Sequence, residues 1–66
     1  MNLQKYIELV GIEKVMEITG VSKQTVYNWK NLVSIPSPHN AAVLIMESRG
    51  VLNWENVYEP FFSEEV

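Results

Sequence analysis

The chain has 66 residues, no cysteine and a formal net charge of −3 at pH 7. This length allows one small domain, and the absence of cysteine excludes a disulfide scaffold and a thiolate metal site. The longest apolar run covers only residues 41–46, whereas a membrane-spanning helix needs about 20 residues. We therefore expect a cytoplasmic protein without a membrane partner or a leader peptide.

Apolar residues that recur at intervals of three and four predict an all-α domain of four to five helices over residues 1–62. The expected helices cover residues 3–10, 12–19, 23–31 and 38–49. After Gly50 the pattern allows either a further short helix over 54–58, capped by Asn53, or a strand. We expect residues 63–66 to form a disordered tail.

The same periodicity assigns side chains to the core or to solvent. The residues expected to face inward on the first and fourth helices are Leu3, Ile7, Val10, Ala41, Ala42, Leu44, Ile45 and Met46, with Tyr6 beside them. Gln4, Lys5 and Glu8 are expected to face solvent. We expect Arg49 to lie in the last turn of the fourth helix and Gly50 to end that helix.

Residues 12–30 are divided by Gly20 into two short amphipathic segments. A glycine between two such segments supplies the positive φ of a tight turn. Ser22 follows as a natural N-cap, because its hydroxyl can accept a hydrogen bond from a free backbone N–H of the next helix. Two helices joined in this way form a helix-turn-helix, whose second helix reads the major groove of DNA.

This stretch resembles the helix-turn-helix of small phage repressors of the Cro type and of the related YdaS-type regulators. The turn glycine and the apolar positions of that pattern are filled by Gly20, Val15, Val21, Val26 and Trp29. Met16 departs from it, because the family usually has a small residue there, although a flexible methionine can be accommodated. The resemblance covers about residues 3–58 and implies a lambda-repressor-like arrangement of helices.

The resemblance implies a sequence-specific regulator of transcription that binds double-stranded DNA, and more narrowly a Cro-like repressor. Its helix over 23–31 would read an operator half-site in the major groove, and a homodimer would read two half-sites. By position, the residues expected to contact bases are Lys23, Gln24 and Asn28, flanked by Ser22 and Tyr27. Glutamine and asparagine can bond bidentately to adenine, and lysine can donate to guanine.

Phosphate contacts are expected where helices begin and where the helix over 23–31 ends, because free backbone N–H groups and cationic side chains lie there. The candidates are Lys14, Lys30, Asn31, Ser37, His39 and Asn40. All eight acidic residues lie outside residues 18–46, whereas Lys23 and Lys30 lie inside. The expected DNA-binding face is therefore locally positive on an acidic protein, so non-specific DNA binding should be weak.

The C-terminal segment is rich in large apolar side chains, namely Trp54, Val57, Tyr58, Phe61 and Phe62. One interpretation is that they close the core over the first and fourth helices. The other is that part of this cluster is exposed and forms the contact between two copies of the chain.

No pattern in the sequence indicates an enzyme, a cofactor, a metal site or a small-molecule substrate. His39 is the sole histidine, no glycine-rich phosphate loop is present, and no serine has a credible base partner. The alternative to a DNA-binding regulator is a protein-binding module on the same scaffold, such as a phage-encoded antagonist or an antitoxin-like partner. Such a module would act through the acidic surface and the aromatic C-terminus.

Overall fold

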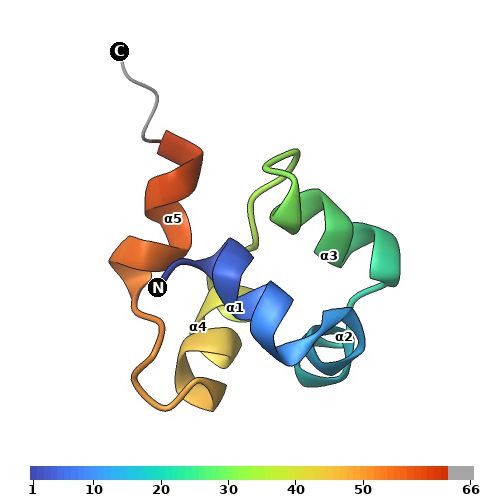
Figure 1. The fold of residues 1–66 in the computed structure, drawn as a ribbon, viewed down its shortest axis with the longest axis horizontal. Helices are drawn as coiled ribbons and strands as arrows, with labels where there is room; N and C mark the ends of the chain where they lie inside the picture. Colours follow the sequence, from blue (N-terminus) through green and yellow to red (C-terminus); the bar gives the residue numbers. More distant parts are fainter. Residues whose placement is uncertain (63–66) are drawn as a thin grey trace.

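Residues 1–62, the part of the chain that the computed structural model describes, fold into five α-helices (Figure 1). Their bounds are Leu3–Val10 for α1, Ile12–Thr19 for α2, Lys23–Lys30 for α3, Pro38–Glu47 for α4 and Trp54–Phe62 for α5. This part of the chain contains no strand, so the all-α prediction is confirmed and the strand alternative after Gly50 is wrong. The tail predicted for residues 63–66 lies outside the described residues. Among α1 to α5, no helix is both long and apolar enough to cross a membrane.

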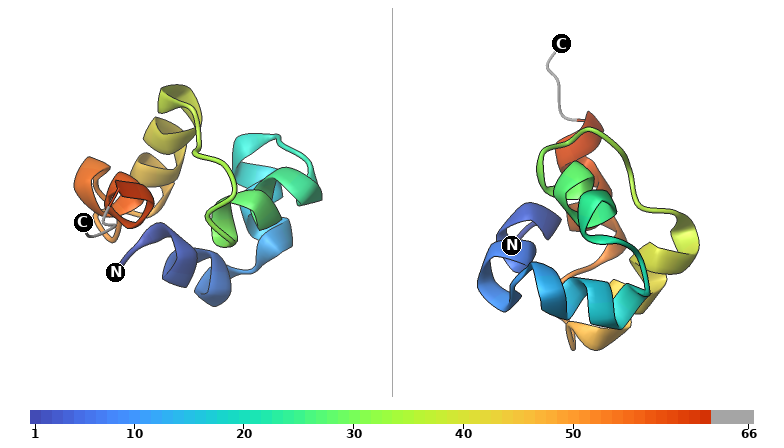
Figure 2. Two further views of the ribbon diagram at one scale, coloured as in Figure 1. Left: turned by 90° about the horizontal axis from the view of Figure 1, so that it is seen from above. Right: turned by 90° about the vertical axis from the view of Figure 1, so that its right-hand side faces the viewer.

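The helices α3 and α5 lie at opposite ends of the longest axis, with α1 between them (Figures 1 and 2). α2 packs against α1, α3 and α4, whereas α5 packs against α1 and α4. The N-terminal helix α1 contacts α2, α3 and α5, so it joins the two ends of the domain. One end of the domain is consequently formed by α3 and the turn before it, away from the C-terminal helix.

Polar side chains mark where the helices begin. Asn2, Ser22 and Ser37 each accept a hydrogen bond from the backbone N–H three residues later, at 2.9, 3.3 and 3.2 Å. At α5, the side chains of Asn53 and Asn56 accept from each other's backbone N–H at 2.8 and 2.7 Å. This reciprocal pair satisfies two donors that a helix start leaves free. Hence α5 begins at residue 54, where the helix alternative placed it.

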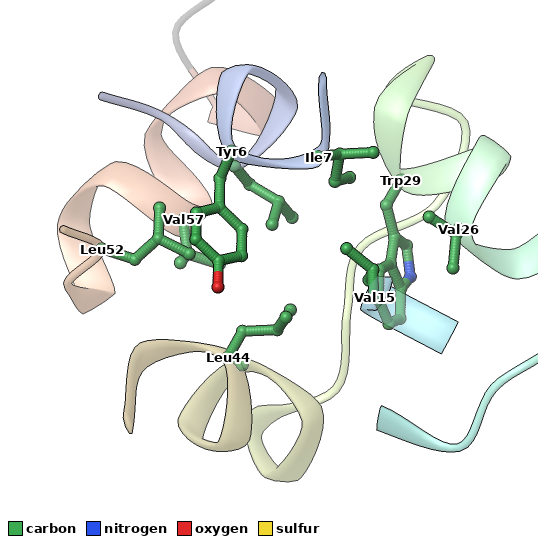
Figure 3. Packing of buried hydrophobic residues seen from close by; sticks show 10 residues of the cluster. Tyr6, Ile7, Val15, Val26, Trp29, Leu44, Leu52 and Val57 are labelled. Carbon is green, nitrogen blue, oxygen red and sulfur yellow. The ribbon is translucent and has the colours of Figure 1, made fainter. Parts of the chain in front are cut away.

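The core collects side chains from every helix. Its buried members are Leu3, Tyr6, Ile7, Val15, Val26, Trp29, Ala41, Leu44, Leu52 and Val57. Figure 3 shows Trp29 of α3 beside Val15 of α2 and Val26. Tyr6 of α1 points toward α4 (Figure 3). Burial, and to a smaller extent the Glu47 carboxylate, raise the pKa of the Tyr6 phenol, so this ring stays neutral in the core.

Two side chains predicted to face inward are exposed. Met46 is 77% exposed, because it lies two residues beyond Leu44 and therefore on the far side of α4. Val10 is exposed at the end of α1. Helical periodicity gives the inner face of a helix, but it does not give how far the neighbouring helices extend along that face.

The helix α4 ends two residues before its predicted end, because Ser48 holds the chain there. The Ser48 hydroxyl donates to Ile45 O at 2.8 Å and accepts from Leu52 N at 2.9 Å. Arg49 and Gly50 then take left-handed backbone conformations, with φ of +55° and +93°. The prediction that Arg49 lies in the last helical turn is therefore wrong.

The turn between α2 and α3 depends on Gly20. This residue has φ of +78° and ψ of +12°, and its N–H donates to Met16 O at 2.7 Å. Only glycine adopts this conformation without a steric cost from Cβ. The side chain of Met16 is half-buried and packs against the core, so the large residue is accommodated close to the turn.

We predict that Gly20→Ala lowers the free energy of unfolding by about 1–2 kcal/mol. The loss arises from backbone strain alone, because a Cβ at Gly20 would meet no atom within 4 Å. Gly20→Asn should lose less, since asparagine tolerates a left-handed φ. Urea unfolding followed by circular dichroism measures both variants, and an alanine variant as stable as the wild type would contradict this turn geometry.

Candidate nucleic-acid interface

The helix α3 turns one side to the core and the other to solvent. Val26 and Trp29 are buried, with Trp29 only 2% exposed, and they fix the rotation of the helix. The predicted base-contacting residues lie on or directly before the outer side: Ser22, Lys23, Gln24 and Tyr27 are exposed, and Asn28 is half-buried. The structure thus brings all five onto one stretch of surface, which we call the α3 face.

Ser22 holds the start of α3. Its Oγ accepts from Thr25 N at 3.3 Å and lies 3.0 Å from Thr25 Oγ1. The hydroxyl is therefore engaged within the chain, so the first role of Ser22 is to cap α3. Lys23, in the first turn, forms no ion pair with residues 1–62, so its ammonium group is available to an anionic partner.

Gln24 and Asn28 lie one turn apart on α3 and are hydrogen-bonded to each other. Gln24 Nε2 donates to Asn28 Oδ1 at 2.9 Å. Amide pairs at this spacing stabilise a helix. The bond joins two otherwise mobile side chains and favours this orientation of the Gln24 amide before any ligand is present.

The loop after α3 is held by the backbone of the helix. Asn28 O accepts from Val33 N at 2.7 Å and from Ser34 N at 3.3 Å. Leu32 N donates to Trp29 O at 3.2 Å, and Leu32 itself has a left-handed φ of +62°. These bonds turn the chain sharply at the end of α3, and Ser22, Lys23, Gln24 and Tyr27 stay exposed.

Gln4 was predicted to face solvent, but it contacts α3 instead. Gln4 is half-buried, and its Nε2 donates to Trp29 O at 2.9 Å, so α1 holds the last turn of α3. Its Oε1 is buried without a partner among residues 1–62. Gln4 follows Leu3 at the flank of the buried stripe of α1, where a long side chain can reach a neighbouring helix. No sequence pattern identifies the carbonyl that it reaches.

The predicted phosphate contacts come from three different helix ends. Lys14 lies in the first turn of α2, Lys30 and Asn31 end α3, and Ser37, His39 and Asn40 begin α4. Lys30 and Asn40 are half-buried, whereas the other four are exposed. Lys14 Nζ lies 3.9 Å from Glu17 Oε1, an exposed ion pair that solvent screens and that a phosphate can displace. Ser37 caps α4 through its hydroxyl.

The aromatic C-terminal cluster divides between the two interpretations. Val57 is buried, and Tyr58 and Phe61 are half-buried and pack against the core. Trp54 and Phe62, by contrast, are 51% and 69% exposed. The Trp54 and Tyr58 rings stack with their centroids 6.2 Å apart, and Tyr58 Oη donates to Pro36 O at 3.0 Å. Part of the cluster therefore closes the core and part of it remains at the surface.

Among the described residues no three histidine or acidic side chains are grouped so that they could hold a metal ion, and no pocket opens in this part of the chain. No protein-family model, no curated protein and no solved structure matches this chain. Its function is therefore inferred from the α3 face and the residues that hold it.

We predict that Ser22→Ala lowers the free energy of unfolding by about 1 kcal/mol, because it removes the cap of α3. For a domain of this size the melting temperature should fall by roughly 4–8 °C. Ser22→Asp should retain the stability, since a carboxylate also caps a helix start. Ser34→Ala is the matched control, because the Ser34 hydroxyl makes no hydrogen bond within residues 1–62. Equal melting temperatures for both alanine variants would refute the capping role.

Proposed function

We propose that this chain binds double-stranded DNA sequence-specifically and regulates transcription, as a Cro-like repressor that places α3 in the major groove of an operator half-site. The observation that carries the proposal is the α3 face on the second of two helices joined by residues 20–22. A helix-turn-helix of this kind presents the outer side of its second helix to base edges. In this proposal the protein acts by binding and not by catalysis.

The dimensions of α3 suit this role. An α-helix with its side chains is about 10–12 Å wide, and the major groove of DNA is about 12 Å wide. In both views of Figure 2 and in Figure 1, no other helix lies over the outer side of α3. A duplex can therefore approach the α3 face without meeting the C-terminal helix.

The charges of α3 itself favour DNA, whereas the neighbouring helix α2 exposes Glu13 and Glu17 beside Lys14. Lys23 and Lys30 lie on α3, and residues 18–46 contain no acidic side chain. Glu55 and Glu59 lie on α5, at the other end of the long axis (Figure 1). With few cationic side chains at the interface, few counterions are released, so sequence-specific contacts must supply a large share of the affinity.

A homodimer completes the proposal, because one α3 contacts only a few base pairs. Two copies related by a two-fold axis would place their α3 helices about 34 Å apart, in successive major grooves. Trp54 and Phe62, which are exposed on α5, are our candidates for the contact between the copies. Large exposed aromatic side chains often lie at such contacts.

The same two side chains support one alternative function, in which the chain binds another protein instead of DNA. Trp54 and Phe62 lie on α5 with the exposed Glu55 and Glu59, so this helix offers a mixed aromatic and acidic surface. Such a surface also suits another protein, as in an antagonist or an antitoxin-like regulator. Salt separates the two functions, because even a few phosphate contacts make DNA binding weaken with rising salt, whereas an aromatic contact does not weaken in this way.

The proposal is tested by titrating isotope-labelled protein with a duplex of mixed sequence at low salt and following the backbone amide signals by NMR. We predict shifts at Lys14, at 22–28, at Lys30 and at 37–40, all reversed by added salt. The signals of α5 should stay in place if each copy binds DNA independently at low protein concentration. A titration without any shift, together with a pool of random duplexes from which no site is enriched, would refute DNA binding.

Lys23 and Lys5 provide a matched pair of controls for this titration, because both are exposed lysines on short helices. Lys23→Ala should weaken binding and Lys5→Ala should leave it nearly unchanged. An equal loss in both variants would indicate general attraction between the protein and DNA instead of contact through α3.

We predict that the double variant Trp54→Ser, Phe62→Ser shifts the protein toward monomer and reduces affinity for a two-half-site operator more than for a single half-site. Leu9→Ser is the control, because Leu9 is 69% exposed on α1, as Phe62 is on α5. Sedimentation velocity measures the first effect and a gel-shift titration the second. A double variant that dimerises as strongly as the wild type would exclude α5 from the contact.

A further inference from the structure

The hydrogen bond between Gln24 and Asn28 limits what the two amides can offer to DNA. Gln24 Nε2 donates one of its two N–H groups to Asn28 Oδ1, at 2.9 Å. Neither side chain makes another hydrogen bond within residues 1–62. Gln24 is thus left with a free carbonyl oxygen and one free N–H, and Asn28 is left with its two N–H donors. Both lie on the α3 face.

We infer that Gln24 selects adenine and that Asn28 is the positioning residue that orients the Gln24 amide toward the adenine edge. This inference rests on the proposed DNA-binding function. Adenine displays the N7 acceptor and the N6 amine donor side by side in the major groove. The free oxygen of Gln24 accepts from the amine, and its free N–H donates to N7. Cytosine offers only an amine donor and thymine only an oxygen acceptor, so each satisfies half of this pattern.

Guanine is rejected for a different reason. Its major-groove edge consists of two acceptors, N7 and O6. A mobile glutamine can turn its amide and present both N–H donors to them. A Gln24 amide held by Asn28 presents one donor and one acceptor, so the Gln24 oxygen faces guanine O6 and no bond forms there.

Asn28 also contributes directly, through its two free N–H groups. They can donate to an acceptor on a neighbouring base pair, such as guanine O6 or thymine O4, while Gln24 engages one lone pair of Oδ1. Holding Gln24 in place before binding lowers the conformational entropy lost on the DNA, a gain worth roughly two- to tenfold in affinity.

The first experiment selects bound sequences from a pool of random duplexes, using the wild type, Gln24→Ala and Asn28→Ala. Wild-type sites should share adenine at one position in each half-site. Gln24→Ala should relax that position alone. Asn28→Ala should relax its own neighbouring position and admit guanine at the adenine position. Asn28→Asp keeps the acceptor for Gln24, so it should preserve the adenine preference even though its charge weakens binding.

The atoms of the contact are then tested in the selected site. Replacing the adenine by 7-deazaadenine removes N7, and replacing it by purine removes the amine. Each change should lower wild-type affinity at least about fivefold, and neither should matter to Gln24→Ala. The control is 2,6-diaminopurine, which adds a minor-groove amine and leaves the major-groove edge intact.

The amide pair can also be observed without DNA. The side-chain NH2 signals of Gln24 should shift in Asn28→Ala and stay in place in Glu8→Ala, a change on the exposed side of α1. Selected sites without a Gln24-dependent adenine, or an Asn28→Ala variant that keeps the adenine preference in full, would overturn this inference alone. A pool without enrichment, together with no salt-sensitive binding to any duplex, would overturn the proposed function and this inference with it.

Discussion

The burial of Trp29 is the interaction on which the rest of the domain depends. The helix α3 has eight residues, and a helix of this length is unstable on its own in water. Trp29 and Val26 anchor it in a core shared with α1, α2 and α4, and Gln4 holds the carbonyl of Trp29 from α1. Because these contacts fix the rotation of α3 about its axis, they also decide which side chains face outward. The composition of the α3 face is therefore a consequence of the core.

The two ends of the domain carry different chemistry, and α1 connects them. At one end lie the amides and lysines of α3, in a stretch of sequence without acidic residues. At the other end α5 exposes Trp54 and Phe62 among glutamates. In the proposed function, this separation would let one small domain bind DNA with one end and a second copy with the other. Distance and salt screening would also keep repulsion between α5 and a duplex small.

Most of the fold follows from local rules in the sequence. Glycines and N-cap residues such as Gly20 and Ser22 gave the bounds of α2 and the start of α3, because the physics of a helix end is local. The length of α5 was missed: the predicted helix stopped at residue 58, whereas α5 continues through Pro60 to residue 62, and Phe61 packs against the core. Helical periodicity also predicted the outer side of α3, but not the bonds that Gln4 and Gln24 make. Those bonds depend on rotamers and on neighbours distant in sequence. The role of the α3 face in binding DNA stays a prediction.

Asn28 serves the fold and the surface with different atoms. Its backbone oxygen holds the loop that follows α3, through Val33 N and Ser34 N, while its side chain reaches only Gln24. Any residue supplies the same backbone oxygen, so the side chain at this position can be exchanged without loosening the loop. The same division holds for Lys23, Gln24 and Tyr27, which lie outside the core. The scaffold can therefore acquire new surface specificities by point mutation while its folding stability is left almost intact.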